Sequence, residues 1–376
     1  SESDDVYTGT SERDVANGSG GNDVLDGLAG NDVLSGGEGN DTFSVTPGAF
    51  VDFPFHIDLN TGLDQYGNRY VNIENLVGGN KADIFTGDIG NNILDGQAGD
   101  DTINAGDGDD KVIGGDGNDT LNGDDGDDHI FGGDGDDIIN AGDGWDDVEG
   151  GAGADQIDGG AGDNDAADYV SSDAGVTVNL KTGVNTGGHA QGDTLTNIEF
   201  VYGSMHDDVI AGDDGKNRLV GRLGDDELNG GNGDDTLIGG RGADHLDGGN
   251  GVDTADYTWS DNGVTVHLGK GVGLGGDAHG DTLENIENVV GSDQNDKITG
   301  DDGTNRLNGG DGDDILRGGG GKDYLIGDFS GADIMLGHAA FMSNRLGCVP
   351  DEMPNLKAYV QRISERPAFD KAINMS

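Results

Sequence analysis

The feature that most constrains this chain is a nine-residue unit, Gly-Gly-x-Gly-x-Asp-x-Leu-x, which recurs along most of its length. Residues 114–122 read GGDGNDTLN, residues 230–238 read GGNGDDTLI and residues 309–317 read GGDGDDILR. One apolar residue in nine fits no helix face, because an amphipathic helix needs apolar residues every three or four positions. The unit instead predicts short strands with one inward side chain each, joined by turns that use the positive φ angles open to glycine.

Positions six and eight of the unit define its chemistry. Position eight is apolar in every copy. A disordered acidic linker is the alternative that the glycine content suits, but a linker would not require this apolar position. Position six is asparagine in three copies, Asn92, Asn217 and Asn305. In the other copies it is aspartate: Asp23, Asp32, Asp41, Asp83, Asp101, Asp110, Asp119, Asp128, Asp137, Asp146, Asp155, Asp208, Asp226, Asp235, Asp244, Asp253, Asp296, Asp314 and Asp323.

The net charge of the chain indicates that these aspartates require a counter-ion. The sequence has 75 acidic against 19 basic residues, a formal net charge of -56. One buried leucine per nonapeptide offsets little of the conformational entropy that nine ordered residues lose. A cation must therefore neutralise the turns, and carboxylate and carbonyl oxygens favour Ca²⁺ over softer metals. We predict that the position-six aspartates are metal ligands, that the cofactor is Ca²⁺ and that folding is coupled to metal binding.

The nonapeptide resembles the calcium-binding repeat of the repeat-in-toxin (hemolysin-type) family. The resemblance implies an all-β fold, a calcium-bound parallel β-roll or β-solenoid. It also implies export from bacteria by type I secretion machinery, and folding when the chain meets extracellular calcium. Relatives often carry a protease, lipase or pore-forming domain ahead of the repeats.

Blocks of the unit alternate with spacers that break its period. The second and third spacers are copies of one module, and the first is a degenerate copy. We place the repeat blocks at residues 1–43, 78–167, 203–255 and 291–327, and the spacers at residues 44–77, 168–202 and 256–290.

Comparison of the two full spacer copies separates recurring residues from the rest. Tyr169 recurs as Tyr257 and Asp193 recurs as Asp281, whereas Asp277 stands in the place of His189. A histidine metal or catalytic site common to both copies is therefore not expected. We interpret each spacer as a wider coil with a long loop on the same solenoid. A contact of that loop with a glycan or a protein is the functional alternative.

The later blocks all begin in the same way. Position four of the first copy is Lys81, His206 or Gln294 instead of glycine, and position six of the second copy is asparagine. An asparagine amide can coordinate a metal through its oxygen but brings no charge. We therefore predict that these two half-turns form a metal-poor ramp from spacer to block.

The chain changes character at residues 328–376. Ser330 and Asp333 fit the N-cap and N3 positions of a helix, and Pro354 opens a second helical pattern. These segments resemble the C-terminal helices of a bacterial glutathione transferase. The half that binds glutathione is absent, so the resemblance implies a short α-helical tail without transferase activity. A helical cap on the solenoid and a misassembled reading frame are the alternatives.

Several classes of function are not expected from the sequence. It contains no H-E-x-x-H, G-x-S-x-G or P-loop motif, so we expect no enzymatic activity. It has no run of 18 apolar residues that would predict a membrane span. The strong negative charge argues against nucleic acid as a partner.

These observations predict a secreted, extracellular, non-enzymatic β-roll that binds calcium and forms the repeat region of a larger bacterial exoprotein. One alternative is a calcium-dependent adhesin or matrix module that binds a glycan or a cell-surface protein through its spacer loops. The other is the C-terminal fragment of a secreted hydrolase or toxin.

Overall fold

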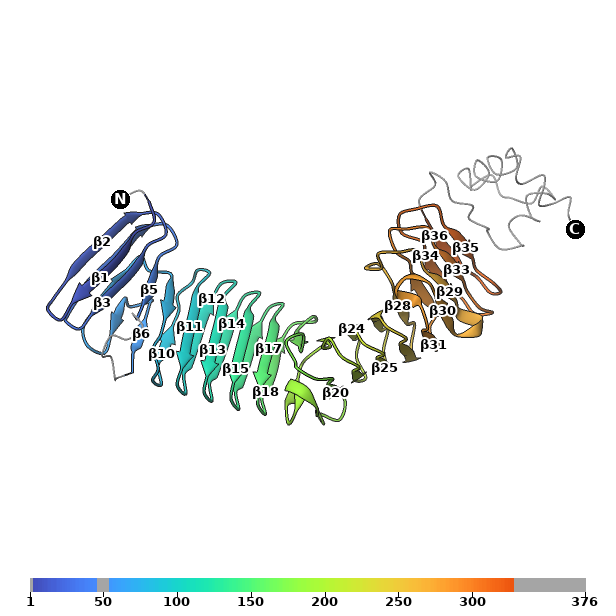
Figure 1. The fold of residues 1–376 in the computed structure, drawn as a ribbon, viewed down its shortest axis with the longest axis horizontal. Helices are drawn as coiled ribbons and strands as arrows, with labels where there is room; N and C mark the ends of the chain where they lie inside the picture. The colour runs from blue at the N-terminus through green and yellow to red at the C-terminus, as the bar shows by residue number, and fades with distance from the viewer. Residues whose placement is uncertain (1–2, 46–53, 328–376) are drawn as a thin grey trace, which may run out of the picture. The chain divides into compact units, whose positions relative to one another are not determined.

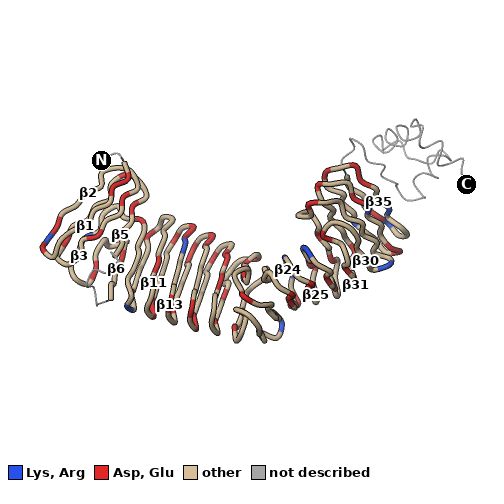
Figure 2. Tube along the Cα trace, in the orientation of Figure 1, with Lys and Arg blue, Asp and Glu red and all other residues tan. Residues whose placement is uncertain are grey.

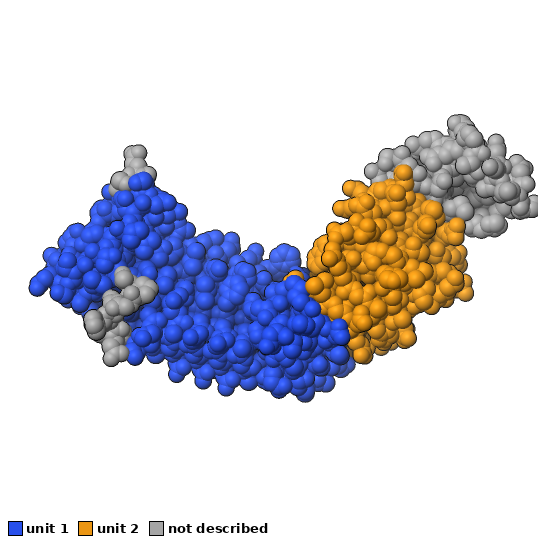
Figure 3. Space-filling model, viewed as in Figure 1, with its two compact units in different colours: residues 1–213 blue, residues 214–376 orange. Residues whose placement is uncertain are grey.

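The computed structural model describes residues 3–45 and 54–327 (Figure 1). The chain forms two compact units, Ser1–Asp213 and Asp214–Ser376 (Figure 3). In each unit the described residues form a parallel β-solenoid, which confirms the predicted all-β fold class. The helical tail predicted at residues 328–376 lies outside the described residues.

The coil of the solenoid is two nonapeptides long. In unit 1, Ile103 pairs with Leu121 in the adjacent parallel strand, and such partners are 18 residues apart. The nonapeptides between them form a second sheet, in which Val112 pairs with Ile130. Successive nonapeptides therefore lie alternately in two sheets that face each other across one core.

Unit 1 contains two long sheets and one additional strand pair. Its first sheet consists, in spatial order, of β1 (Val6–Thr10), β3 (Val24–Leu28), β5 (Thr42–Ser44), β9 (Asn75–Val77), β11 (Ile93–Ala98), β13 (Lys111–Asp116), β15 (His129–Asp134), β17 (Asp147–Ala152), β19 (Ala166–Asp168) and β22 (Phe200–Tyr202). Its second sheet consists of β2 (Val15–Gly20), β4 (Val33–Glu38), β8 (Arg69–Val71), β7 (Leu63–Asp64), β6 (His56–Asp58), β10 (Ile84–Thr86), β12 (Thr102–Asp107), β14 (Thr120–Asp125), β16 (Ile138–Asp143), β18 (Gln156–Ala161) and β21 (Thr194–Thr196). The additional pair is β20 (Thr177–Asn179) with β23 (Val209–Ala211).

Unit 2 repeats this arrangement with two sheets. The first consists of β24 (Arg218–Leu223), β26 (Thr236–Arg241), β28 (Thr254–Asp256), β32 (Asn288–Val290), β34 (Arg306–Asn308) and β36 (Tyr324–Ile326). The second consists of β25 (Glu227–Asn232), β27 (His245–Asn250), β31 (Thr282–Glu284), β30 (Val272–Leu274), β29 (Thr265–His267), β33 (Lys297–Thr299) and β35 (Ile315–Arg317).

Helical structure in the described residues is limited to single 3₁₀ turns in the spacers. These are η1 (Gly188–Ala190), η2 (Leu268–Lys270) and η3 (Gly276–Ala278). No helix in residues 3–45 and 54–327 has the length and apolar character that a membrane crossing requires.

The core is a double column of position-eight side chains. In unit 1, Val112 and Ile130 from one sheet and Ile103 and Leu121 from the other are fully buried. Strand geometry turns the neighbouring side chains at positions seven and nine to the outer face. Every coil thus adds one apolar residue from each sheet, and the core continues from coil to coil as a narrow column.

The spacers widen a coil but keep its ends in the sheets. In unit 1, Thr194 of β21 pairs with Gln156 of β18, and Phe200 of β22 pairs with Ala166 of β19. The chain between β19 and β21 adds β20 and η1. Because spacer strands and repeat strands share the same sheets, the block boundaries drawn from the sequence remain a prediction.

Substitution of the two adjacent isoleucines of β16 tests whether only one face of each strand contributes to the core. Ile139 is 1% exposed and Ile138 is 48% exposed. We expect Ile139→Ala to lower the free energy of unfolding of the calcium-loaded protein by about 2–5 kcal/mol, because it leaves a cavity in the column. Ile138→Ala should lower it by less than about 0.5 kcal/mol. Denaturant titration of both variants measures the difference, and equal losses would contradict this core.

Candidate metal centre

The position-six aspartates form ladders that link successive coils. In unit 1 the backbone N–H of Asp83 donates to Oδ1 of Asp101 (2.6 Å), and that of Asp101 donates to Asp119 (2.7 Å). The ladder continues to Asp137 and Asp155 at 2.8 Å and 2.9 Å. One carboxylate oxygen of each aspartate therefore holds the register between two coils.

The other position-six residues form the same type of ladder. In unit 1 the second ladder runs from Asn92 through Asp110 and Asp128 to Asp146, with distances of 2.6–2.8 Å. Further rungs join Asp5 to Asp23, Asp14 to Asp32, Asp23 to Asp41, Asp226 to Asp244, Asp235 to Asp253, Asp296 to Asp314, and Asn305 to Asp323. Of the predicted ligands, Asp323 alone is only half-buried.

The second oxygen of most of these carboxylates is buried without a donor. Asp119 is 1% exposed, and its Oδ2 has no hydrogen-bond partner among the described residues. Burying a carboxylate oxygen without a donor or a cation is unfavourable, because its hydration is lost and not replaced. The same orphaned Oδ2 occurs in Asp23, Asp32, Asp41, Asp101, Asp110, Asp128, Asp137, Asp146, Asp155, Asp244, Asp253 and Asp314.

Glycine at position one makes room for this oxygen. A Cβ atom on Gly114 would lie 2.3 Å from Oδ2 of Asp119 and 2.6 Å from the carbonyl oxygen of Gly132 in the next coil. At Gly114 any larger residue would have to displace the carboxylate or the backbone, whereas two other copies carry alanine at position one, Ala105 and Ala141. The spacing between Gly and Asp in the unit thus reflects a packed turn in which carboxylate and carbonyl oxygens lie close together.

The buried carboxylates resist ionisation. Burial is the main cause of the raised pKa values. The hydrogen bond from a backbone N–H lowers the pKa, and neighbouring carboxylates raise it further. For Asp101 these neighbours include Asp119. The pKa rises from 3.8 to about 7 for Asp101, Asp110, Asp146 and Asp155, and to about 6 for Asp128, Asp137, Asp244 and Asp296. Near neutral pH the ladders therefore favour a proton or a cation.

Three of the predicted ligands differ from the rest, because the protein already supplies a donor to Oδ2. Each is the first position-six residue of a later block, and its partner is the backbone N–H four residues earlier. The pairs are Gly79 with Asp83 (2.9 Å), Ser204 with Asp208 (2.6 Å) and Ser292 with Asp296 (2.7 Å). These aspartates remain predicted ligands, but the structure leaves them less need of a cation.

The asparagines that follow are satisfied in the same local way. The side-chain oxygen of Asn92 accepts the N–H of Asp88, and its amide donates to the carbonyl of Glu74, both at 2.8 Å. Asn305 makes the equivalent two bonds, to Asp301 and Glu287, at 2.9 Å. These contacts support the metal-poor ramp, which stays a prediction.

The sequence reasoning missed Asp165. Asp165 accepts the N–H of Asp146 (3.1 Å) and has an orphaned Oδ2 like the predicted ligands. A one-residue insertion before it puts Asn164 at position six of a strict nine-residue count. An alignment of the segments before Tyr169 and Tyr257 would have identified Asp165, because it pairs Asp165 with Asp253.

Position five carries a second, exposed ladder that the sequence reasoning also missed. Asp100, Asp109, Asp127 and Asp136 are exposed, as expected from the sequence. Their side chains nevertheless accept backbone N–H groups from the following coil, for example Asn118 N–H to Asp100 at 3.0 Å. The position-five bonds point along the solenoid in the opposite direction to the position-six bonds, so neighbouring turns are tied together twice.

The donor set of these turns fits a hard cation. Figure 2 shows acidic residues in coil after coil with few basic residues between them. Within the described residues, no three carboxylate, imidazole or thiol groups cluster closely enough to hold an ion by themselves. Ca²⁺ takes six to eight oxygens, so main-chain carbonyls of the turns are the donors that can complete a site begun by the orphaned Oδ2 atoms. The assignment of individual ligands stays a prediction.

Comparison with known protein families agrees with this geometry. The model described as RTX calcium-binding nonapeptide repeat (4 copies) matches more than half of the chain. The matched residues are 8–43, 77–112, 113–146, 140–175, 202–237, 220–255 and 282–316. A search of curated proteins finds no match.

A second family model, Glutathione S-transferase, C-terminal domain, matches residues 313–367. Residues 313–327 of that match contain β35 and β36, which are strands of the solenoid and not transferase helices. The rest of the match lies outside the described residues.

Asp119 and Asp100, in successive coils, offer a matched test of the ladder. Asp119→Asn keeps an oxygen for the N–H of Asp101 but removes the charge that attracts a cation. We expect it to shift the calcium midpoint of folding, followed by circular dichroism, to higher calcium. Asp100→Asn makes the same chemical change at an exposed position and should leave the midpoint nearly unchanged. Equal shifts would show that net charge, and not the buried carboxylate, sets the calcium requirement.

Protonation of the buried carboxylates should partly substitute for calcium in stabilising the fold. Because the folded-state pKa of Asp101 and Asp155 is about 7 against an ordinary 3.8, the folded chain binds more protons than the unfolded chain between about pH 4 and pH 7. The contribution of these carboxylates to the stability of the metal-free roll is therefore fully present at the acid end and is lost as the pH rises through about 7. In chelator we expect more β signal at pH 5.5 than at pH 8. The calcium midpoint should rise as the pH falls, because protons compete for the same oxygens. A metal-free roll that gains structure on alkalinisation would contradict this.

Proposed function

Because the chain belongs to the family of RTX calcium-binding nonapeptide repeat proteins, with Ca²⁺ as its cofactor, we propose that it is the calcium-folded repeat region of a secreted bacterial protein. In this proposal it acts outside the cell, has no catalytic activity of its own and leaves the cell through type I secretion machinery. Folding on arrival in a calcium-rich medium is its central property.

The observation that carries the proposal is the row of buried carboxylate oxygens without donors. In the metal-free chain these oxygens oppose folding, because burial removes their hydration and brings neighbouring carboxylates together. Calcium supplies compensating positive charge when bound. The same sequence is therefore expected to be unfolded where calcium is scarce, as in a cytosol, and folded where it is abundant.

Circular dichroism of the purified chain tests calcium-dependent folding. With chelator at pH 8 the spectrum should be largely that of a coil, and millimolar calcium should produce a cooperative rise in β signal. Magnesium at the same concentration should substitute poorly, because it demands rigid octahedral geometry and releases water reluctantly. A β spectrum that chelator does not change would refute the proposal.

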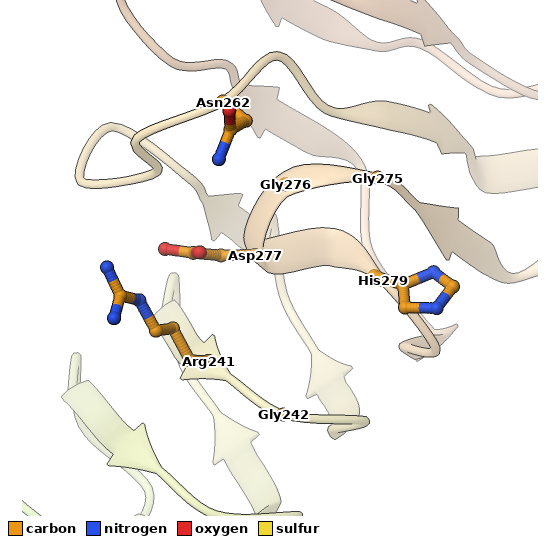
Figure 4. Close-up of a pocket in the computed structure, with 7 residues that line it drawn as sticks. All are labelled: Arg241, Gly242, Asn262, Gly275, Gly276, Asp277 and His279. Carbon is orange, nitrogen blue, oxygen red and sulfur yellow. The ribbon is translucent and has the colours of Figure 1, made fainter.

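A second candidate function, glycan binding through a spacer loop, is favoured by one feature of unit 2. The second full spacer copy borders an open pocket of about 450 Å³. Figure 4 shows the Arg241 guanidinium and the Asp277 carboxylate on the same side of this pocket. Its lining residues are Arg241, Gly242, Asn262, Gly275, Gly276, Asp277 and His279.

An exposed aromatic ring belongs to the same spacer loop. Trp259 is 59% exposed, with the Arg218 guanidinium 5.6 Å from its ring centre. Exposed rings stack on sugar faces, while guanidinium, carboxylate and amide groups bond to hydroxyls. The first full copy has Ser171 and His189 in the places of Trp259 and Asp277. A sugar site is therefore proposed for the second copy only.

A glycan array probed with the calcium-loaded chain tests this second candidate. We expect Trp259→Ala and Asp277→Ala to abolish any glycan binding. Trp145→Ala removes a similarly exposed tryptophan, 55% exposed, from unit 1 and should retain it. The absence of glycan binding in the wild-type chain, or its loss in all three variants, would leave the calcium-folded region as the sole proposal.

A further inference from the structure

The carboxylates at the ends of the ladders differ from those in the interior. Asp193 accepts the N–H of Asp155 through Oδ1 (3.0 Å), so it occupies the next rung of that ladder. Its Oδ2, however, accepts a hydrogen bond from the hydroxyl of Tyr169 (3.0 Å). Asp193 and Tyr169 are each 2% exposed. Asp193 therefore differs from an interior rung in the donor that faces its second oxygen.

The second full spacer repeats this arrangement in unit 2. Asp281 accepts the N–H of Asp244 through Oδ1 (3.0 Å) and the hydroxyl of Tyr257 through Oδ2 (2.9 Å). Tyr257 is 3% exposed and Asp281 is 2% exposed. A buried tyrosine that donates to a buried carboxylate is a charge-assisted bond, and the same pair in two places is not an accident of one loop.

The blocks that follow the spacers begin with aspartates that are also satisfied. Asp208 receives the N–H and the hydroxyl of Ser204 at 2.6 Å and 2.7 Å. In unit 2, Asp296 receives the same two groups of Ser292 at 2.7 Å and 3.0 Å. Within each unit, a spacer thus contains one aspartate satisfied by tyrosine and is followed by one satisfied by serine.

We propose that each full spacer module closes one of the two calcium ladders without an ion: the tyrosine hydroxyl takes the place that calcium fills at interior rungs, so Asp193 and Asp281 are metal-free rungs. The calcium bound along that ladder then falls into separate runs, each bounded by a spacer. This inference rests on the proposed calcium-dependent folding and specifies where along the chain it acts.

Counting bound calcium in two variants of one ladder tests this assignment. Asp244→Asn and Asp281→Asn change adjacent rungs of the same ladder, and both keep an oxygen for the backbone N–H of the previous coil. Equilibrium dialysis in saturating calcium should show fewer ions per chain for Asp244→Asn and an unchanged number for Asp281→Asn. Circular dichroism in the same buffer confirms that both variants are folded.

The tyrosine gives an independent test with a charge-specific rescue. Tyr257→Phe leaves Oδ2 of Asp281 buried without a donor, so the calcium midpoint of folding should shift to higher calcium. Tyr324→Phe, at a position 68% exposed in the same unit, should not shift it. Adding Asp281→Asn to Tyr257→Phe removes the charge that the hydroxyl stabilised and should return the midpoint toward the wild-type value. A purely structural defect would not be rescued.

The outcomes separate the inference from the proposed function. A loss of bound calcium in Asp281→Asn equal to that in Asp244→Asn would overturn the metal-free rungs and leave calcium-dependent folding intact. The same holds if Tyr257→Phe behaves like Tyr324→Phe. A wild-type chain that binds no calcium would overturn both.

Discussion

The hydrogen bond from a backbone N–H to the position-six carboxylate of the next coil is the interaction on which the rest of the solenoid depends. It sets the register between coils, as the bond from Asp101 to Asp119 illustrates. It also pulls the carboxylate into the interior, where the second oxygen loses its hydration. The bond that orders the fold therefore buries a charge that must be neutralised, so we expect folding to be coupled to ion binding.

The parts of this structure that the sequence predicts are those with strict local periodicity. A single apolar residue in each nonapeptide predicted short strands with one inward side chain each, and the resemblance to the repeat-in-toxin family implied that these strands form a parallel coil. Residues such as Leu121 and Ile130 then lie where the period puts them. The position-six aspartates were predicted as metal ligands from charge and spacing alone. Their burial and their orphaned oxygens agree with that role, but which of them bind an ion stays a prediction.

What the sequence did not predict depends on contacts between distant residues. Asp165 joins the ladder despite a shifted count, because its neighbour in space, Asp146, sets the register. The bond between Tyr169 and Asp193 joins residues on either side of the spacer loop, and no periodicity connects them. Comparison of the two spacer copies showed that these residues recur, but recurrence does not reveal which atoms meet.

In the first spacer, the end of a ladder is satisfied by a different set of hydrogen bonds. There the N–H of Asp32 donates to the amide oxygen of Asn68, and the Asn68 amide in turn donates to Asp64 (2.8 Å). The hydroxyl of Tyr70 donates to the same Asp64 carboxylate (3.1 Å). A neutral amide thus ends the ladder, and the charge is moved to the Asp64 carboxylate, whose Oδ2 alone has two protein donors.

Protons and calcium ions neutralise a ladder in different ways. A proton satisfies one oxygen of one carboxylate and adds no connection between coils. Calcium requires several oxygens at once, and the oxygens near each orphaned Oδ2 come from different turns, as the contacts at Gly114 show. We therefore expect an ion bound at one rung to order the adjacent turn and to favour binding at the next rung, as in a solenoid with nearest-neighbour coupling. If this propagation ends where the protein already supplies the donor, we expect the spacers to bound the cooperative unit of calcium-dependent folding.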